Sequence, residues 1–329
     1  MSNIKWYLSK KTSPYENLVL EEAILRDENI TDDIFYFYRN DNSIIIGRNQ
    51  NIYEEVNLYF AREKNINLYR RISGGGAVYQ DLNNVCFSYI THSKGSYEKF
   101  LTPIIEFLKS LGLNATFKGR NDLAVDGFKV SGNAQYSTPT RMVHHGTLLF
   151  DFNIEIMQNA LKVNPLKMES KGIKSIRQRV ASLINLMPEK ITIEEFVQKL
   201  VSWFAKENNA TELVLDLDLY ETRLAPIRKE RMSDEWIFGK TPNFEVTNES
   251  KFDGGIIRAS YSVKAGKFCQ FKFEGDYLSK VDTEIISEKM IGINYEVEAV
   301  QEALTKYDLI DYFGEISLNE IIEVIFGKY

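Results

Sequence analysis

The sequence has few of the residues that stabilise small secreted or metal-dependent proteins. Its 329 residues include two cysteines, Cys86 and Cys269, and three histidines. Two such distant cysteines form no disulfide framework and no CxxC pair, so we expect a protein of the reducing cytoplasm. A chain of this length can bury a full hydrophobic core without a disulfide or a metal ion.

Long apolar runs and an excess of basic charge are also missing. No run of about 18 apolar residues occurs, and the start, MSNIKWYLSKK, has no apolar segment typical of a signal peptide. We therefore expect neither secretion nor membrane association. The 40 Lys and Arg residues against 46 Asp and Glu give a net charge of −6. Because nucleic-acid binding requires a basic face, we expect no nucleic-acid partner.

The composition is that of an ordinary globular protein, with 44% hydrophobic and 26% charged residues. The length favours a large domain with a smaller companion. Residues 243–255 are polar, end in glycine and show no periodicity, so we place the domain boundary there. The expected domains are residues 1–247 and residues 248–329.

The larger part is predicted to combine helices with strands. Ser13, Pro14 and Glu16 form a helix start for residues 17–27, and a capping box at Thr192 and Glu195 opens a strongly periodic helix over 192–207. Near-continuous apolar strands at 34–40 and 43–51 indicate a sheet covered on both faces. The other expected elements are strands at 85–90 and 145–152, a helix at 102–112, and a hairpin over 122–132 that turns at Asp126-Gly127.

The last part of the chain is predicted to be a small α+β domain. Residues 256–280 alternate like antiparallel strands, with turns at 265–266 and 275–276. Two helical segments follow, around 283–305 and 315–326, and this order of elements is typical of an α+β domain.

The stretch RRISGGGAVYQ, residues 70–80, carries the first functional signal. Consecutive glycines cost conformational entropy, but they let the backbone approach a ligand and direct successive amides at an anion. Arg70 and Arg71 could add forked donors for a carboxylate or phosphate. The stretch is neither a Walker A loop nor GxGxxG. Taken alone, the stretch is better explained as an ordinary hairpin bend with two solvated arginines.

Two further stretches carry polar residues next to predicted strands. Asn121 and Asp122 offer an amide and a carboxylate for a base, a ribose or a cation, and Lys129 could neutralise charge that moves in a reaction. The ordinary alternative for Lys129 is a solvated hairpin lysine. His144 and His145 lack a third zinc ligand at suitable spacing and could equally be structural, whereas the following glycine would allow close backbone approach.

The two remaining features have ordinary explanations. The run at 162–180 is basic, and it fits a solvated face or a surface that steers an acidic partner or phosphates. Cys86 lies within an apolar strand, where a buried and inert thiol is expected.

Five segments in order resemble the lipoate–protein ligase family, which is related to the biotin ligases and the lipoyl and octanoyl transferases. They are IGRNQN (46–51), RRISGGGAVYQDLNN (70–84), GRNDLAVDGFKVSG (119–132), HHGTLL (144–149) and KGIKSIRQRV (171–180), and WIFGKTPNF (236–244) resembles the end of the family's large domain. The resemblance covers about residues 13–245. It implies an α+β fold, in which a biotin/lipoate ligase-like large domain with a mixed sheet flanked by helices precedes a small α+β C-terminal domain.

The implied activity has two steps. Lipoate and ATP, with Mg²⁺, give lipoyl-AMP and pyrophosphate, and the lipoyl group then passes to a lysine of a carrier. The implied carriers are the apo lipoyl domains of 2-oxoacid dehydrogenase complexes and the glycine-cleavage H-type protein, and a monomer is expected. The implied nucleotide- and adenylate-binding residues are Arg70, Arg71, Ser73, Gly74, Gly75, Gly76, Ala77, Val78, Tyr79, Asn121, Asp122, Lys129, His145, Gly146 and Thr147.

Three of these implications are more specific. Lys129 is the catalytic residue, placed between the lipoate carboxylate and the α-phosphate, and Asp122 holds Mg²⁺ through the phosphates. The lipoyl chain occupies a hydrophobic tunnel from the strands at 34–46 and 85–90. Many relatives have histidine where this chain has Gln80, so no role is assigned to that position.

Two alternatives to a ligase remain open at this point. A lipoyl or octanoyl transferase would take its acyl group from a carrier protein, with Cys86 as the candidate nucleophile. A non-catalytic protein would bind lipoate or the apo carrier and would release no pyrophosphate from ATP.

Overall fold

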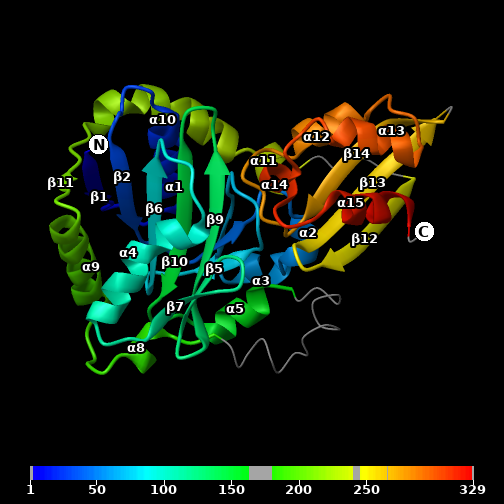
Figure 1. Ribbon diagram of the computed structural model, residues 1–329. Coiled ribbons are helices and arrows are strands. Elements are labelled where there is room, and N and C mark those ends of the chain that lie inside the picture. The colour runs from blue at the N-terminus through cyan, green and yellow to red at the C-terminus, as the bar shows by residue number, and fades with distance from the viewer. Residues whose placement is uncertain (1–2, 163–179, 240–244, 265, 328–329) are drawn as a thin grey trace.

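The computed structural model describes residues 3–162, 180–239, 245–264 and 266–327, which form two sheet-based domains side by side (Figure 1). The large domain is built on an eight-stranded sheet in the order β11-β1-β2-β6-β10-β9-β8-β7. β1 runs parallel to β2 and β11, and the remaining neighbours are antiparallel, which confirms a mixed sheet. The strands are β1 Ile4–Leu8, β2 Asp33–Tyr38, β6 Asn84–Thr91, β7 Ala115–Lys118, β8 Asp122–Val125, β9 Phe128–Ser137, β10 Met142–Leu149 and β11 Thr211–Glu212.

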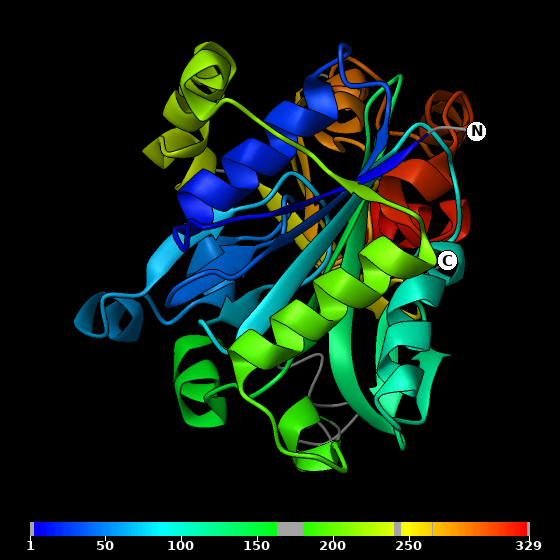
Figure 2. The same ribbon diagram turned by 90° about the vertical axis from the view of Figure 1, so that its left-hand side faces the viewer.

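Helices cover both faces of this sheet (Figure 2). α1 (Pro14–Arg26) and α10 (Leu217–Arg231) lie on one face, and α4 (Tyr97–Ser110) and α9 (Ile193–Glu207) lie on the other. Because successive side chains of a strand point to opposite faces, Phe35 and Phe37 join the α4–α9 core while Tyr36 joins the α1–α10 core. The apolar β2 sequence is thus explained by burial on both sides, as predicted.

A second, three-stranded sheet packs beside the first. Its central strand β3 (Ser43–Ile46) is parallel to β4 (Asn67–Arg70) and antiparallel to β5 (Val78–Gln80). The short helices of the large domain are α2 Ile52–Glu55, α3 Leu58–Glu63, α5 Ile154–Ala160, α8 Leu183–Leu186 and α11 Asp234–Phe238. The strand expected over 43–51 ends at Ile46. Glycine is required at the next position, because a Cβ on Gly47 would lie 1.9 Å from the Gly75 carbonyl oxygen.

The strongest local patterns are confirmed, and two helix starts differ in detail. α9 has the complete capping box, and the predicted hairpin turns through Asp126 at φ +49° and Gly127 at φ +86°. Ser13 precedes α1, but its side chain makes no capping hydrogen bond. α4 begins at Tyr97 rather than near 102, because the Ser96 side chain caps it and Pro103 is accommodated inside the helix.

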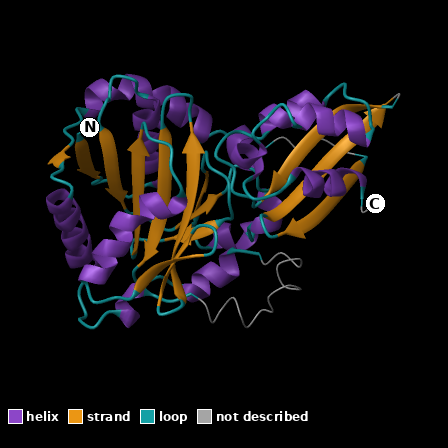
Figure 3. Cartoon of the chain, in the orientation of Figure 1, coloured by secondary structure: helices purple, strands orange, loops and turns teal. Residues whose placement is uncertain are grey.

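The small domain has one antiparallel sheet covered by helices (Figure 3). Its elements are β12 Val246–Phe252, β13 Gly255–Lys264, β14 Lys267–Gly275, α12 Glu284–Met290, α13 Val297–Leu304, α14 Leu309–Phe313 and α15 Leu318–Phe326. The α+β composition is confirmed. The polar stretch interpreted as a boundary contains β12, which pairs with β13 along its whole length. The helical segment expected around 283–305 contains two separate helices, α12 and α13.

No helix within the described ranges has both the length and the apolar character needed to cross a bilayer.

Candidate functional site

A cavity of about 180 Å³ in the large domain brings together most of the predicted site residues. They arrive from β5, β9, β10 and the loops that follow β4 and β7. The predicted residues that line it are Arg71, Gly75, Gly76, Ala77, Val78, Asn121, Lys129, His145, Gly146 and Thr147. The lining also contains Leu18, Tyr38 and Ile45, which add an apolar wall.

Five predicted residues do not line this cavity: Arg70, Ser73, Gly74, Tyr79 and Asp122. Tyr79 shows why. Side chains alternate along β5, so Val78 and Gln80 face the cavity whereas Tyr79 is buried on the other side. There the Tyr79 hydroxyl donates to Asn42 Oδ1 over 3.0 Å.

Arg70 is held by main-chain carbonyls. Its guanidinium donates to the carbonyl oxygens of five residues, at 2.6–3.1 Å: Gly47, Arg48, Gln50, Trp236 and Ile237. Burial lowers the pKa of Arg70 to about 10, so it stays charged at neutral pH. This side chain ties β4 to α11 and to the loop after β3.

Arg71 shapes the glycine loop, residues 73–77, from inside. Its Nη2 donates to the carbonyls of Gly74 at 2.7 Å and Gly76 at 2.9 Å, and its Nε donates to Ser73 Oγ at 3.1 Å. Burial lowers the pKa of Arg71 to about 10, so a positive charge stands in the cavity wall at neutral pH.

The three glycines, Gly74, Gly75 and Gly76, have different neighbours, and their predicted contacts with a ligand stay a prediction. The Gly74 amide donates to the Ser279 carbonyl at 3.3 Å, and the Gly75 amide donates to the Tyr277 carbonyl at 2.9 Å. A Cβ on Gly74 would lie within 2.7 Å of both small-domain residues, whereas a Cβ on Gly76 would meet nothing within 4 Å. The small domain thus occupies the first two amides, and Gly76 faces open space.

Lys129 and Asp122 form an ion pair at the edge of the cavity. Lys129 Nζ lies 2.7 Å from Asp122 Oδ1, and the two side chains are 40% and 33% exposed. Both residues belong to the β8–β9 hairpin, Asp122 to β8 and Lys129 to β9, and the register of this hairpin shifts between Leu123 and Ala124. Within the described ranges, no group of three or more His, Cys, Asp or Glu side chains could hold a metal ion.

Gly146 is required by a side chain of the protein itself. Asn133 donates through Nδ2 to the Asn121 carbonyl at 2.9 Å and to Ser131 Oγ at 3.1 Å, and Asn121 Nδ2 donates back to the Asn133 carbonyl. These bonds place Asn133 Oδ1 only 1.9 Å from where a Cβ on Gly146 would be. The close approach predicted at Gly146 is therefore made by the Asn133 amide.

The two histidines point to opposite faces of β10 and have different roles. His144 packs among Phe87, Tyr97 and Phe100, and burial lowers its pKa to about 3, so it is a neutral structural residue. His145 lines the cavity, with Nε2 at 2.6 Å from Ser73 Oγ and Nδ1 at 2.9 Å from Glu21 Oε1.

Glu21 is the residue that the sequence interpretation missed. It is 1% exposed on α1, within the apolar stretch NLVLEEAIL. A carboxylate in such a stretch needs a buried partner, so its position was the available signal. Of the strands predicted to form a lipoyl tunnel, 34–46 contributes Tyr38 and Ile45 to the cavity, and 85–90 contributes no residue, so the tunnel stays a prediction. Cys86 is buried away from it, and burial raises the pKa of its thiol.

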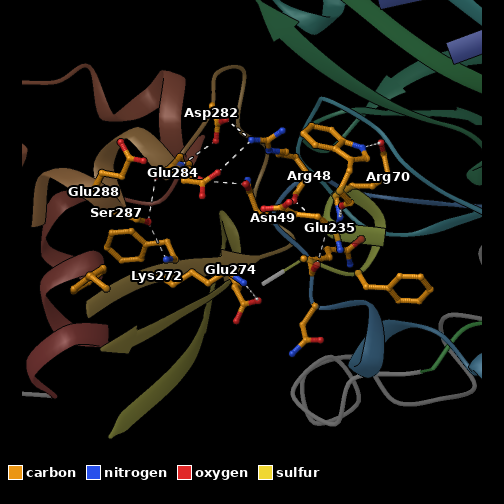
Figure 4. A pocket seen from close by; sticks show the side chains of 18 of the residues that line it. Arg48, Asn49, Arg70, Glu235, Lys272, Glu274, Asp282, Glu284, Ser287 and Glu288 are labelled. Atoms are coloured by element: carbon orange, nitrogen blue, oxygen red, sulfur yellow. Dashed lines mark hydrogen bonds and ion pairs between the residues drawn. The ribbon is translucent and has the colours of Figure 1, made fainter. Parts of the chain in front are cut away.

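A second cavity, of about 640 Å³, lies between the domains (Figure 4). At its edge Arg48 pairs with Asp282 and lies 3.5 Å from Glu284, and its guanidinium is 4.2 Å from the Trp236 ring centroid. Asn49 bonds Ser279 at 2.9 Å and Thr283 at 2.8 Å. The IGRNQN segment thus holds the small domain.

Charge distinguishes the two cavities. Among the described residues, the cavity between the domains is lined by six carboxylates and three cations: Glu230, Glu235, Glu274, Asp282, Glu284 and Glu288, and Arg48, Arg70 and Lys272. Within the part of the chain that the structure describes, the smaller cavity is lined by the cations Arg71 and Lys129 and by no carboxylate. An anionic ligand is therefore favoured in the smaller cavity.

Most of the basic run 162–180 and residues 240–244 lie outside the described residues.

Known proteins match this chain in sequence along nearly its whole length. The lipoyl protein ligase A/B catalytic domain matches residues 13–205, and the bacterial lipoate protein ligase C-terminus matches residues 241–325. Lipoate–protein ligase 1 of Staphylococcus aureus is 39% identical over 318 residues, which cover 95% of this chain and 97% of that protein.

Solved structures have the same fold. The crystal structure of P. falciparum LipL1 in complex with lipoate has a TM-score of 0.83 and 25% identity, over 99% of this chain and 100% of that one. A crystal structure of lipoate–protein ligase A bound with ATP has a TM-score of 0.62 and 24% identity, over 73% of this chain and 99% of that one. Taken with the matched residues, the sequence identity and the arrangement of the cavity, these likenesses show that the chain belongs to the lipoyl protein ligase A/B family.

Proposed function

We propose that this protein is an ATP-dependent lipoate–protein ligase, which activates lipoate as lipoyl-AMP and passes the lipoyl group to a lysine of a carrier domain. One observation carries the proposal: the smaller cavity joins an apolar wall, which includes Leu18, Tyr38 and Ile45, to the cations Arg71 and Lys129. A lipoyl-adenylate has the matching parts, an apolar chain and an anionic mixed anhydride. The relatives support it, since the Staphylococcus aureus relative is named lipoate–protein ligase 1 and P. falciparum LipL1 was solved in complex with lipoate.

The first step joins two anions. A lipoate carboxylate oxygen attacks the α-phosphorus, and the bond between that phosphorus and the pyrophosphate oxygen breaks. Negative charge spreads over the phosphoryl oxygens in the transition state, where the Lys129 ammonium and the Arg71 guanidinium stabilise it. No nucleophilic side chain is needed, because adenylation itself activates the acyl group. This agrees with the burial of Cys86 away from the cavity.

Mg²⁺ is part of the proposal. Magnesium is usually bound by one or two carboxylates together with substrate phosphates, and it would neutralise phosphate charge here. Asp122, beside the cavity edge and paired with Lys129, is the proposed protein ligand. This fits a site without a protein-only cage among the described residues.

We propose that the nucleotide contacts the cavity-lining residues that were predicted from the sequence. Its closest approach to the backbone would be at Gly76, where a Cβ would meet no atom within 4 Å. Ligand pockets usually measure about 300–1,000 Å³. The present cavity, about 180 Å³, must therefore widen to hold a complete adenylate.

The proposed carriers are the apo lipoyl domains of 2-oxoacid dehydrogenase complexes and the glycine-cleavage H-type protein, and we propose a cytoplasmic monomer.

The test is a lipoylation assay with an apo lipoyl domain, lipoate and Mg²⁺, with and without ATP, read by mass spectrometry of the carrier. We expect the lipoyl group on one carrier lysine only when ATP is present. Lipoate-dependent exchange of pyrophosphate into ATP measures the first step alone. Acylation from an acylated donor carrier without ATP would indicate a transferase, and no acylation in either assay would indicate a binding protein.

A further inference from the structure

A continuous line of buried polar groups connects α1 to the guanidinium in the cavity wall. Arg71 Nε lies 3.1 Å from Ser73 Oγ, Ser73 Oγ lies 2.6 Å from His145 Nε2, and His145 Nδ1 lies 2.9 Å from Glu21 Oε1. All four side chains are buried, with residue exposures between 0% and 8%. We call these residues, Glu21, His145, Ser73 and Arg71, the buried relay.

The Arg71 end of the buried relay favours one direction for its hydrogen bonds. A guanidinium can only donate, so Ser73 Oγ accepts from Arg71, and its own hydrogen then has His145 Nε2 as its acceptor. In this arrangement Nε2 is unprotonated and the ring hydrogen lies on Nδ1, facing the Glu21 carboxylate. The alternative, in which Ser73 Oγ accepts from both Arg71 and Nε2–H, leaves the hydroxyl hydrogen without an acceptor among the described residues. Among the described residues, the hydrogen bonds of Ser73 Oγ are those with Arg71 and His145.

Glu21 is held in place by further donors. The Ser88 hydroxyl donates to Glu21 Oε2, and the Tyr38 hydroxyl lies 3.4 Å from the same oxygen. Three side chains thus direct donors at one carboxylate, and Tyr38 also lines the cavity. A buried carboxylate with this many donors is a rigid anchor, because each bond fixes a rotamer in its neighbour.

We infer that Glu21 is a positioning residue for adenylation, which fixes the His145 tautomer and, through Ser73, the guanidinium of Arg71 at the cavity wall. The inference rests on the proposed function for its catalytic consequence, but the arrangement of hydrogens does not. A guanidinium that is already oriented stabilises developing charge without reorganisation, so loss of the anchor lowers turnover more than substrate binding.

The same three side chains, Ser73, His145 and Glu21, follow the order of a hydrolase triad, but the geometry argues for positioning. Ser73 is 0% exposed and does not line the cavity. Its oxygen also accepts from Arg71, which reduces its nucleophilicity. A substrate carbon therefore cannot reach it while the buried relay is intact.

The first test reads the tautomer directly. The chain has three histidines, so the ¹⁵N NMR signals of His145 are identified by their loss in His145→Gln. We expect the ring hydrogen on Nδ1 and none on Nε2, and mixed tautomers in Glu21→Gln, whose single amide oxygen cannot serve all the donors. An Nε2–H ring or an imidazolium in the unsubstituted protein would overturn the inference. This result is independent of any enzyme activity.

The second test measures turnover in pyrophosphate exchange, for Glu21→Gln, Ser73→Ala and the double variant. Each single change should lower kcat by about tenfold or more with the KM for lipoate within about twofold, since small misplacements of catalytic groups cost this much. Because both changes break one relay, the double variant should be no slower than the slower single variant. Additive losses, or wild-type turnover in Glu21→Gln, would contradict the inference.

Glu22 supplies a matched control on the same helix. It is also 1% exposed, but it pairs with Arg231 at 2.7 Å and takes no part in the buried relay. Glu22→Gln should lower the unfolding temperature and keep kcat for the folded fraction. Equal kcat losses in the Glu21 and Glu22 variants would indicate a merely structural role. Absence of exchange in the unsubstituted protein would instead disprove the proposed ligase, whatever the tautomer.

Discussion

Lys129 Nζ and Asp122 Oδ1 are 2.7 Å apart, so the ammonium proposed to stabilise the adenylation transition state is held by a carboxylate at the cavity edge. A partly exposed pair of this kind contributes little to folding. Its importance is that it keeps the charge at one place, where a substrate carboxylate and an α-phosphate would meet.

Replacing Lys129 by alanine should therefore affect chemistry rather than folding. We expect Lys129→Ala to lower lipoate-dependent pyrophosphate exchange by about 10²–10³-fold, the usual loss when one preorganised donor is removed. Its unfolding temperature should stay close to that of the wild type, because the side chain is 40% exposed. Wild-type exchange rates would contradict its assignment as the catalytic residue.

The role of Asp122 in magnesium binding can be measured separately. If its carboxylate holds Mg²⁺ through the phosphates, Asp122→Asn should raise several-fold the Mg²⁺ concentration that gives half-maximal exchange. Asp126, on the exposed hairpin tip, is the matched control, and Asp126→Asn should leave this concentration unchanged. An unchanged Mg²⁺ dependence in Asp122→Asn would restrict Asp122 to the pairing with Lys129.

Contact with the small domain should protect the amides of the glycine loop. Arg48 pairs with Asp282 beside the bonds from Gly74 and Gly75 to small-domain carbonyls. Arg48→Ala should therefore speed hydrogen exchange at peptides covering residues 73–76, measured by mass spectrometry. Arg39→Ala removes an ion pair with Glu194 inside the large domain and should not change it. Equal exchange in both variants would show that Arg48 does not hold this contact.

Gly146 and Gly76 should respond differently to alanine. A Cβ at Gly146 would lie 1.9 Å from Asn133 Oδ1, whereas one at Gly76 would meet nothing within 4 Å. Gly146→Ala should cost about 1–3 kcal/mol in the free energy of unfolding, as overpacking usually does. Gly76→Ala should cost much less. Urea denaturation measures both, and Gly146→Ala/Asn133→Ala should recover part of the loss. No recovery would argue against the Asn133 clash.

Glu22 should make stability depend on pH in the acid range. Burial alone would raise its pKa, but hydrogen bonds and charge from Arg231 and Arg26 hold the pKa below the ordinary value of 4.5. A carboxyl with a lowered folded-state pKa stabilises the protein above its unfolded pKa, and this stability is lost as pH falls through the folded-state pKa. The unfolding temperature should therefore fall more steeply below pH 4.5 in the wild type than in Glu22→Gln. Parallel curves would contradict this.

Several features of the fold are encoded over short distances in the sequence. The capping box at Thr192 and Glu195 forms as predicted, and so does the Asp126-Gly127 turn, because each depends on residues within one turn of chain. The domain boundary placed in the stretch 243–255 stays a prediction, but the strand within it had no local pattern, since β12 is polar and only its pairing with β13 makes it a strand. The start of α4 was misplaced because Pro103 is tolerated inside a well-packed helix.

The candidate site shows the same division. The types of residue needed for an anionic, acyl-bearing ligand were evident from the segments around Arg71, Lys129 and His145, and these three side chains do meet at one cavity. The sequence alone also determined the family, because those segments occur together in order. The role of each residue depended on the side of its strand to which the side chain points. Strand alternation turns Tyr79 away and Gln80 inward, and it separates His144 from His145.

Only the tertiary structure decided what lies against the glycines and what anchors Arg71. Ser279 is some two hundred positions from Gly74 along the chain, and Glu21 belongs to the first helix. Such contacts leave no local pattern, because they depend on where whole elements pack. The sequence specifies which groups can donate and accept, and packing determines which of them are close enough to do so.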